Sequence, residues 1–399
     1  MSISMPMKPN GDVIVFDIGG THFRHAVFTQ GGIGGSPPIK EETPSVFSHP
    51  KEDVKTLQQE LVGKIANAVR FHRAKNPSIK LVGISFPAPV NSKGVALRTS
   101  GIWEDKGDNF PLLDRVKRQL CQPGEEDISV FVANDLTAAA ESYAYEYRKS
   151  GKPCNFRLFD VVTISTGIGS KIYDMQTEEV LLNNEGTAGE IGHRPVTLQL
   201  GEEPLRCDCG AMNHLGSFAS GRGIERVAQR EAQKFPESFK ESSLFKLTAG
   251  QIAQIKNELI SKAILEKDPF CNAILEKNTL YLAQVLAQIA NAVGITKFII
   301  TGGFALSLAD RYLDSLINSL LQLKDYFYMQ SEEEIRRMPE LGNLGDTAGL
   351  CGIGLFASKR YERLQREQPR ILSLPSSSSS SQPPQGEQVP HVRQMAATK

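Results

Sequence analysis

The chain has 399 residues, which is enough for two domains or for one large domain. Lysine and arginine together number 45, and aspartate and glutamate also number 45, so a formal charge of zero gives no electrostatic case for binding DNA or a membrane surface. Six cysteines do not make a disulfide framework in a chain this long. No stretch approaches the roughly 20 apolar residues that span a bilayer, and the start of the chain lacks the apolar core of a signal peptide. We therefore expect a soluble, cytoplasmic protein.

The first half of the chain predicts strands that end in glycine or polar residues. The segment 13–28, "VIVFDIGGTHFRHAVF", reads as an apolar strand, a glycine-rich turn and a second strand. Two further apolar strands are expected within 80–90, "KLVGISFPAPV", and within 128–135, "ISVFVAND". The segment 135–148, "DLTAAAESYAYEYR", is rich in alanine and glutamate and predicts a helix.

The second half repeats this pattern. "FDVVTISTGIGSKIY", residues 159–173, again reads as strand, glycine-bearing turn and strand. A helical run near Asn278–Val293, the strand "KFIITGG" and a final helix within 344–367 follow. Strands alternating with helices predict an α/β fold, and two similar turns about 150 residues apart suggest two related lobes facing each other. Residues 368–399 are rich in serine, proline and glutamine and are predicted to form a disordered tail.

The two turns suggest chemistry, although each has a simpler explanation. A glycine-rich turn can point several backbone N–H groups at an anion, and Asp17 before the first turn can hold Mg²⁺ through water. A tight hairpin explains either turn equally well. Asp135 can cap the helix that it opens, or can accept the proton of an attacking hydroxyl. Lys171 follows the second turn and is expected either to touch a phosphate or to face solvent at a strand end.

The segment 207–214, "CDCGAMNH", contains two thiols and a histidine. Thiolate and imidazole both bind zinc, but a C-x-C pair is a poor metal clamp without distant partners. The familiar redox spacing is C-x-x-C, which makes a redox pair the weakest reading. A metal site and a loop with free thiols both stay open on the spacing alone.

Taken together, the motifs resemble those of the ROK family (repressor, open reading frame, kinase). "DIGGT", "AND", "STGIG", "GEIGH", the cysteines at 207 and 209, "ASGRG", "TGGF" and "LGDTAGL" occur in the family's order over roughly residues 12–362. The resemblance implies a two-lobed actin-like ATPase fold of duplicated ribonuclease-H-like domains. It places a smaller lobe at 12–134, completed by a C-terminal helix at about 346–364, and a larger lobe at 135–345. The stretch before "DIGGT" is too short for the family's DNA-binding domain, so we expect the kinase branch.

The resemblance also assigns roles to residues of this sequence. Asp135 matches the catalytic base. The nucleotide-binding positions, which would hold ATP with Mg²⁺, are Asp17, Gly19, Gly20, Thr21, Thr166, Gly167, Gly169, Gly302 and Gly303. The substrate-binding positions are Ser100, Asn134, Asp135, Glu190 and His193. A structural Zn²⁺ site is expected from His193, Cys207, Cys209 and His214, with His214 at the position where the family has a third cysteine.

Three positions depart from the family's sugar kinases. Gly216 replaces a glutamate that grips sugar hydroxyls, Ser100 replaces an asparagine, and Ala88 replaces a glycine. A site built for particular hydroxyls rejects analogues that lack them, so these changes argue against glucose or an N-acetylhexosamine. We expect an ATP-dependent kinase for a sugar or sugar-like polyol, with a cyclitol favoured.

The alternative function is a non-catalytic sugar sensor on the same fold. A dehydrogenase is excluded because neither turn reads G-x-G-x-x-G at the start of a helix. The expected partner is a small-molecule sugar or cyclitol, with no nucleic acid and no membrane. Relatives are often homodimers, although this sequence shows no interface.

Overall fold

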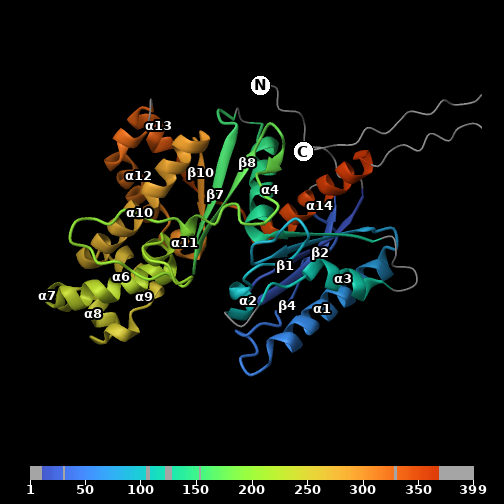
Figure 1. Ribbon diagram of the computed structural model, residues 1–399, viewed down its shortest axis with the longest axis horizontal. Helices are drawn as coiled ribbons and strands as arrows, with labels where there is room; N and C mark the ends of the chain where they lie inside the picture. Colours follow the sequence, from blue (N-terminus) through green and yellow to red (C-terminus); the bar gives the residue numbers. More distant parts are fainter. Residues whose placement is uncertain are drawn as a thin grey trace, which may run out of the picture.

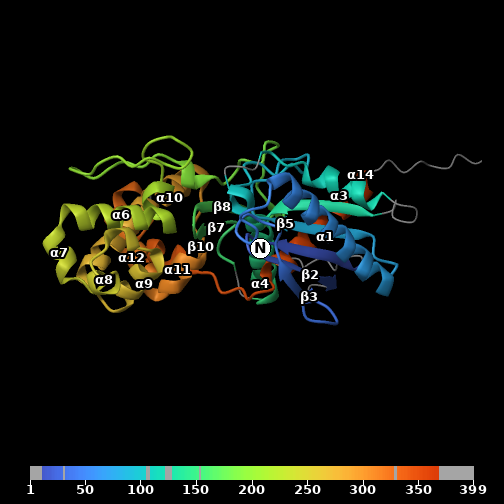
Figure 2. The same ribbon diagram turned by 90° about the horizontal axis from the view of Figure 1, so that it is seen from below.

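The computed structural model describes residues 11–29, 32–104, 108–121, 128–151, 154–327 and 330–367; the predicted tail lies outside them. Two β-sheets form the centres of two halves of the molecule, which lie side by side (Figures 1 and 2). The halves meet at two helices, α4 (Asp135–Lys149) and α14 (Ala348–Glu367), which run between the sheets in Figure 1. This arrangement confirms the two-lobed α/β fold that the sequence predicts.

The first sheet has the strand order β3-β2-β1-β5-β6, with β4 paired to β2. β1 is parallel to β5 and β5 to β6, whereas β2 is antiparallel to β1. The bounds are β1 Val13–Ile18, β2 His22–Thr29, β3 Gly32–Ile33, β4 Ile39–Glu42, β5 Leu81–Phe86 and β6 Ser129–Asn134. Every residue of β1 and β5 is buried, as expected for central parallel strands that are covered on both faces.

Helices cover the two faces of this sheet. The helices are α1 Val54–Lys75, α2 Ser100–Trp103 and α3 Leu112–Leu120, and the C-terminal α14 contacts β1 and β5. Asp53 starts α1 by accepting hydrogen bonds from the backbone N–H groups of Lys55 and Thr56. Trp103 is fully buried in the core, and its indole N–H donates to Pro44 O at 3.1 Å.

The second sheet repeats the order of the first as β9-β8-β7-β10-β11. β7 is parallel to β10 and β10 to β11, and β8 is antiparallel to β7, so each half begins with a hairpin and adds parallel strands beside it. The bounds are β7 Leu158–Ile164, β8 Ile168–Asp174, β9 Glu179–Val180, β10 Phe298–Thr301 and β11 Pro339–Leu341. This repeated strand order is the one that a fold of two duplicated domains predicts.

A group of helices makes the bulk of the second half, at the left of Figure 1. These helices are α5 Gly216–Ala219, α6 Gly221–Lys234, α7 Pro236–Glu241, α8 Ser243–Leu247, α9 Asn257–Leu265, α10 Pro269–Val293, α11 Gly303–Leu308, α12 Asp310–Gln322 and α13 Glu332–Arg337. They share one large apolar core with β7 and β10. No helix of the described residues is long and apolar enough to cross a membrane.

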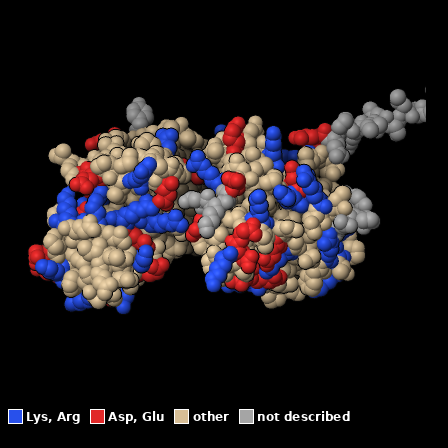
Figure 3. All heavy atoms as spheres, turned by 60° about the horizontal axis from the view of Figure 1, so that its bottom comes forward, with Lys and Arg blue, Asp and Glu red and all other residues tan. Residues whose placement is uncertain are grey.

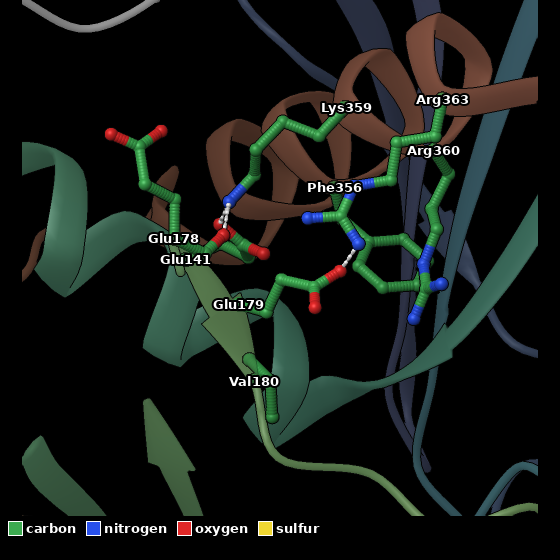
Figure 4. A pocket seen from close by; sticks show the side chains of 8 residues that line it. All are labelled: Glu141, Glu178, Glu179, Val180, Phe356, Lys359, Arg360 and Arg363. Atoms are coloured by element: carbon green, nitrogen blue, oxygen red, sulfur yellow. Dashed lines mark hydrogen bonds and ion pairs between the residues drawn. The ribbon is translucent and has the colours of Figure 1, made fainter. Parts of the chain in front are cut away.

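The contact between α4 and α14 joins the two halves. Ser142 Oγ of α4 donates to Ala348 O at 2.6 Å, and Lys359 of α14 bonds Glu141, the Tyr173 hydroxyl and Glu178 O. A small cavity lies beside these ion pairs (Figure 4) and is lined by Glu141, Glu178, Glu179, Val180, Phe356, Lys359, Arg360 and Arg363. Residues from both halves therefore interlock at this junction.

The helices cross closely because Gly352 has no side chain. A Cβ added at Gly352 would lie 1.7 Å from Ala138 O, so Gly352→Ala is expected to force α4 and α14 apart and to lower the free energy of unfolding by about 3 kcal/mol. Urea unfolding measures the loss. The matched control is Gly63→Ala in α1, where nothing lies within 4 Å, and this change should leave stability equal or raise it by about 0.5–1 kcal/mol. Equal stability of both variants would contradict the close crossing.

Candidate active site and metal cluster

Polar side chains gather where the parallel strands of the first sheet end. In the β-sheet register Asp17 is level with Ser85, and Phe86 is level with Asn134. Because the carboxyl ends of parallel strands meet at one edge, Asp17, Ser85 and Asn134 share that edge. Asp17 is buried and accepts hydrogen bonds from Ser85 Oγ at 3.2 Å and from Arg24 Nη2 at 2.5 Å. Burial raises the pKa of Asp17, and the Arg24 guanidinium opposes that rise.

Arg24 links the first turn to the start of α14. Its Nη1 atom donates to Asp346 O at 2.8 Å, while Nη2 holds Asp17. Gly349 lies against the same carboxylate, since a Cβ there would sit 2.6 Å from Asp17 Oδ2. The C-terminal helix therefore begins at the candidate site, although its sequence is more than 300 residues away from β1.

Asp135 is the first residue of α4 and lies at the same edge of the sheet. Asn134 caps the helix, because its Oδ1 accepts from the Leu136 N–H at 3.0 Å and its amide donates to Ala88 O at 3.0 Å. The side chain of Asp135 is open to solvent, yet the surrounding protein atoms desolvate it and Asp17 adds a like charge. These two causes, opposed by the Leu136 N–H and Lys171, raise the pKa of Asp135 to about 6. Such a value suits a base that works near neutral pH.

The second glycine turn lies against the start of α4. A Cβ at Gly169 would be 3.1 Å from Leu136 Cδ1, so the β7–β8 turn and the residue after Asp135 touch. Gly302 has a φ of 96° and packs against Ile164, at the other side of this turn. Two hydroxyl groups from the segment after β4 hold the first turn: Thr43 Oγ1 donates to Gly19 O at 2.8 Å, and Ser45 Oγ donates to Gly20 O. Each turn also contains a backbone hydrogen bond of its own, Gly19 N to His22 O at 2.8 Å in the first and Ser165 N to Gly167 O at 3.0 Å in the second.

The loop that carries Glu190 runs along β8. Ser170 N donates to Gly189 O at 2.7 Å, and Lys171 Nζ donates to Ala188 O. Lys171 is 3% exposed, so the expectation of a solvent-facing lysine is wrong. Burial lowers the pKa of Lys171, and the carboxylates of Glu190 and Asp135 oppose that shift.

The four residues predicted to bind zinc come together. The ligand atoms of His193, Cys207, Cys209 and His214 all lie within 4.8 Å of one another. Cys207 Sγ is 3.7 Å from His193 Nδ1, and Cys209 Sγ is 3.2 Å from His214 Nδ1. Two thiols and two imidazoles are a common tetrahedral zinc set, so the residues fit this metal. The Nδ1 atom of His193 faces the cluster, so its Nε2 atom is available to bind a different group.

The structure also shows what the sequence reasoning missed. Arg24 and Ser85 touch Asp17, and the hairpin register that puts Arg24 opposite Asp17 was the available signal. Ser100 begins α2, but its side chain lies outside the described residues. On the face in Figure 3 the surface is hollowed between the two halves, and basic and acidic side chains are interspersed over both, which fits the zero formal charge.

Comparisons with known proteins show which family this chain is similar to. The ROK family model matches residues 13–360. A C(7)-cyclitol 7-kinase of Streptomyces hygroscopicus subsp. limoneus is 30% identical over 351 residues, which cover 88% of this chain and 94% of that protein. A 2-epi-5-epi-valiolone 7-kinase of Actinoplanes sp. is 28% identical over 338 residues, covering 83% and 87%. The crystal structure of a ROK family glucokinase from Streptomyces griseus, in complex with glucose and AMPPNP, aligns with a TM-score of 0.62 at 25% identity, covering 88% and 100%. The chain belongs to the ROK family.

Proposed function

We propose that this chain is a kinase that transfers the γ-phosphate of MgATP to a hydroxyl group of a sugar-like cyclitol. The observation that carries the proposal is the position of Asp135. Its carboxylate is open to solvent at the start of α4, beside Asp17 and next to the second glycine turn. Relatives that are 28–30% identical over most of the chain are named as cyclitol kinases, which favours this class of acceptor.

In the proposed reaction the acceptor hydroxyl donates a hydrogen bond to Asp135. The hydroxyl oxygen attacks the γ-phosphorus of ATP as its proton passes to the Asp135 carboxylate, and the bond to the β-phosphate oxygen breaks to release ADP. Phosphoryl transfer depends mainly on positioning and charge neutralisation, with one aligned base. Glu190 and His193 are the proposed acceptor ligands. Asn134 is a third proposed acceptor ligand, because its amide keeps a second N–H after bonding Ala88 O, and it also caps α4.

The nucleotide is proposed to bind between the two glycine turns. Backbone N–H groups of residues 19–21 and 166–169 would face its phosphates, with Gly302 and Gly303 on the adenosine side. Mg²⁺, when bound with ATP, would neutralise phosphate charge. Asp17 is its proposed protein ligand, through water, with Arg24 fixing the direction of the carboxylate.

A zinc ion in the His193 cluster is proposed to stiffen the segment between Glu190 and α5. Apart from the 3-10 turn Ile191–His193, the segment forms no helix or named strand, and loop bonds such as Cys207 N to Ala211 O at 2.8 Å and Val196 N to Asn213 O at 2.9 Å hold it. Tying residues from both ends of it to one ion would fix the backbone beside Glu190. The zinc would take no part in proton or phosphoryl transfer.

The start of α5 also bears on the proposed acceptor class. Gly216 opens this helix, and a Cβ there would be 3.2 Å from Gly192 O, so the helix packs directly on the segment after Glu190. No carboxylate at position 216 is available to bind sugar hydroxyls. We further propose lobe boundaries of 12–134 with 346–364, and of 135–345; a homodimer and a cytoplasmic location stay predictions from the sequence.

The acceptor is tested by following ADP release from MgATP with 2-epi-5-epi-valiolone, glucose and N-acetylmannosamine. We expect kcat/KM for the cyclitol to exceed that for glucose by about 100-fold or more, because an acceptor that leaves buried polar groups unpaired loses transition-state binding. Glucose turning over equally well would contradict the cyclitol assignment while leaving the kinase in place. Binding of an acceptor, seen as a raised melting temperature, with no ADP released would favour the non-catalytic sensor, which the changes at Ser100 and Gly216 make the second candidate.

A further inference from the structure

Lys171 is a buried cation inside the second sheet. It lies in β8, opposite Val161 of β7, and only 3% of its surface is exposed. Residues that are directly opposite in a sheet share a face, and Val161 belongs to the core cluster formed with α4, so Lys171 points to the α4 side. A buried ammonium costs free energy unless it is bonded and paired. Its partners should therefore indicate what it does.

The partners of Lys171 belong to the candidate site. Its Nζ atom donates to Ala188 O, and a Cβ at Gly189 would lie 3.1 Å from Nζ and 1.8 Å from Ser170 O. Segment 188–190 is thus pressed against β8 with Lys171 beneath it. On its other side Ala188 N donates to Asn183 Oδ1 at 3.0 Å, so the segment is held from two directions.

The charges around this ammonium are acidic. Glu190, Asp135 and Asp160 all favour the protonated form of Lys171, while burial lowers its pKa. Asp160 is itself fully buried in β7, next along the strand from Val161. The ammonium therefore interacts with the proposed base and the proposed acceptor ligand, and also with Asp160, which lies on the other face of the sheet.

We propose that Lys171 is a positioning residue of the phosphoryl-transfer site: its ammonium is bonded to Ala188 O and holds segment 188–190 so that Glu190 meets the acceptor. The inference rests on the proposed kinase function. Lys171 has two properties that can be separated. Its hydrogen-bond donor is enough to hold Ala188 O, whereas its positive charge acts on the Asp135 carboxylate at a distance.

The electrostatic part predicts a pH effect of known direction. Asp17 of β1 raises the pKa of Asp135, and Lys171 of β8 and the Leu136 N–H of α4 lower it. Since kcat/KM reports the free enzyme, the wild-type profile should fall below pH about 6, where Asp135 becomes protonated. Loss of the Lys171 charge should move this acid limb to higher pH by roughly half a unit to one unit.

Three variants separate the two properties, with 2-epi-5-epi-valiolone and MgATP as substrates. Lys171→Met removes both donor and charge, Lys171→Gln keeps a donor, and Lys171→Arg keeps the charge. We expect the acid limb to shift in the Met and Gln variants only, and the acceptor KM to rise about 10-fold in the Met variant and less in the Gln variant. Melting temperatures check folding, and if the Met variant fails to fold, the Gln and Arg variants carry the test.

An acid limb at the same pH in all folded variants would overturn the electrostatic role. An acceptor KM within about twofold of wild type in Lys171→Met or, if that variant is unfolded, in Lys171→Gln, would overturn the anchoring role. Absence of turnover in the wild-type protein with every acceptor is a different result, because it contradicts the proposed kinase function itself.

Discussion

Replacing Asp135 with alanine is expected to lower kcat for acceptor phosphorylation by about 10³-fold, within the range that a general base contributes. The fold should survive, because the cap of α4 is Asn134, whose Oδ1 bonds the Leu136 N–H. The pKa of Asp135 in the folded chain is about 6, above the ordinary value, so its ionisation costs folding free energy as the pH rises through 6. At pH 8 the variant should therefore melt at the same temperature as the wild type or higher.

Asp135→Asn is the closest control for this experiment. Asparagine keeps the size of the side chain and an oxygen for the Leu136 N–H, but it cannot take a proton from the acceptor. Both variants should still bind MgATP, as measured by calorimetry. A kcat in Asp135→Asn above about one tenth of wild type would show that another group removes the proton.

Removing the metal from the His193 cluster is expected to lower the melting temperature by about 5 °C or more, since a bound structural zinc adds its binding free energy to the folded state. The purified protein should contain about one zinc per chain by elemental analysis. Chelation should also raise the acceptor KM more than it lowers kcat. The physical reason is that the cluster holds the segment beside Glu190 and does not touch the reacting atoms.

Cysteine variants make the metal prediction specific. Cys209→Ser removes one ligand and should reduce the zinc content strongly. Cys121→Ser changes an exposed cysteine outside the cluster and should leave zinc content and melting temperature unchanged. If Cys209→Ser keeps full zinc, the metal is bound elsewhere; if the wild-type protein contains none, the cluster is a pair of thiol–imidazole contacts.

The sequence predicts the order of the strands well, because apolar β-branched runs ending in glycine are strong local signals. The start of the longest helix shows where such reasoning stops. The apolar periodicity places it near Asn278, whereas α10 begins at Pro269. Asp268 caps it through the Cys271 N–H, and Asp-Pro is a helix-start signal that the periodicity does not register.

The residues of the candidate site also fall into those that the sequence could predict and those that it could not. The motifs pointed to residues in glycine turns and at strand ends, and the four residues predicted to bind zinc lie close together, as the resemblance implied. The role of Lys171 could not be assigned in this way, because it depends on which segments pack on the sheet, whereas Arg24 was accessible only through the register of the β1–β2 hairpin. His25 is a further case: it is 2% exposed and its Nδ1 lies 2.8 Å from His72 Nε2, a pairing of β2 with α1 that no local pattern encodes.

The crossing of α4 and α14 has a geometric consequence for catalysis. Both helices start at the candidate site, α4 with Asp135 and α14 beside Asp17 through Gly349. Their closest approach, at Gly352 and Ala138, lies one turn further along each helix. If one half of the molecule rotates relative to the other about this contact, Asp17 and Asp135 lie close to the rotation axis and move little. The parts of the two halves that lie far from this axis would then close over a substrate, while the distance between the two carboxylates stays nearly the same.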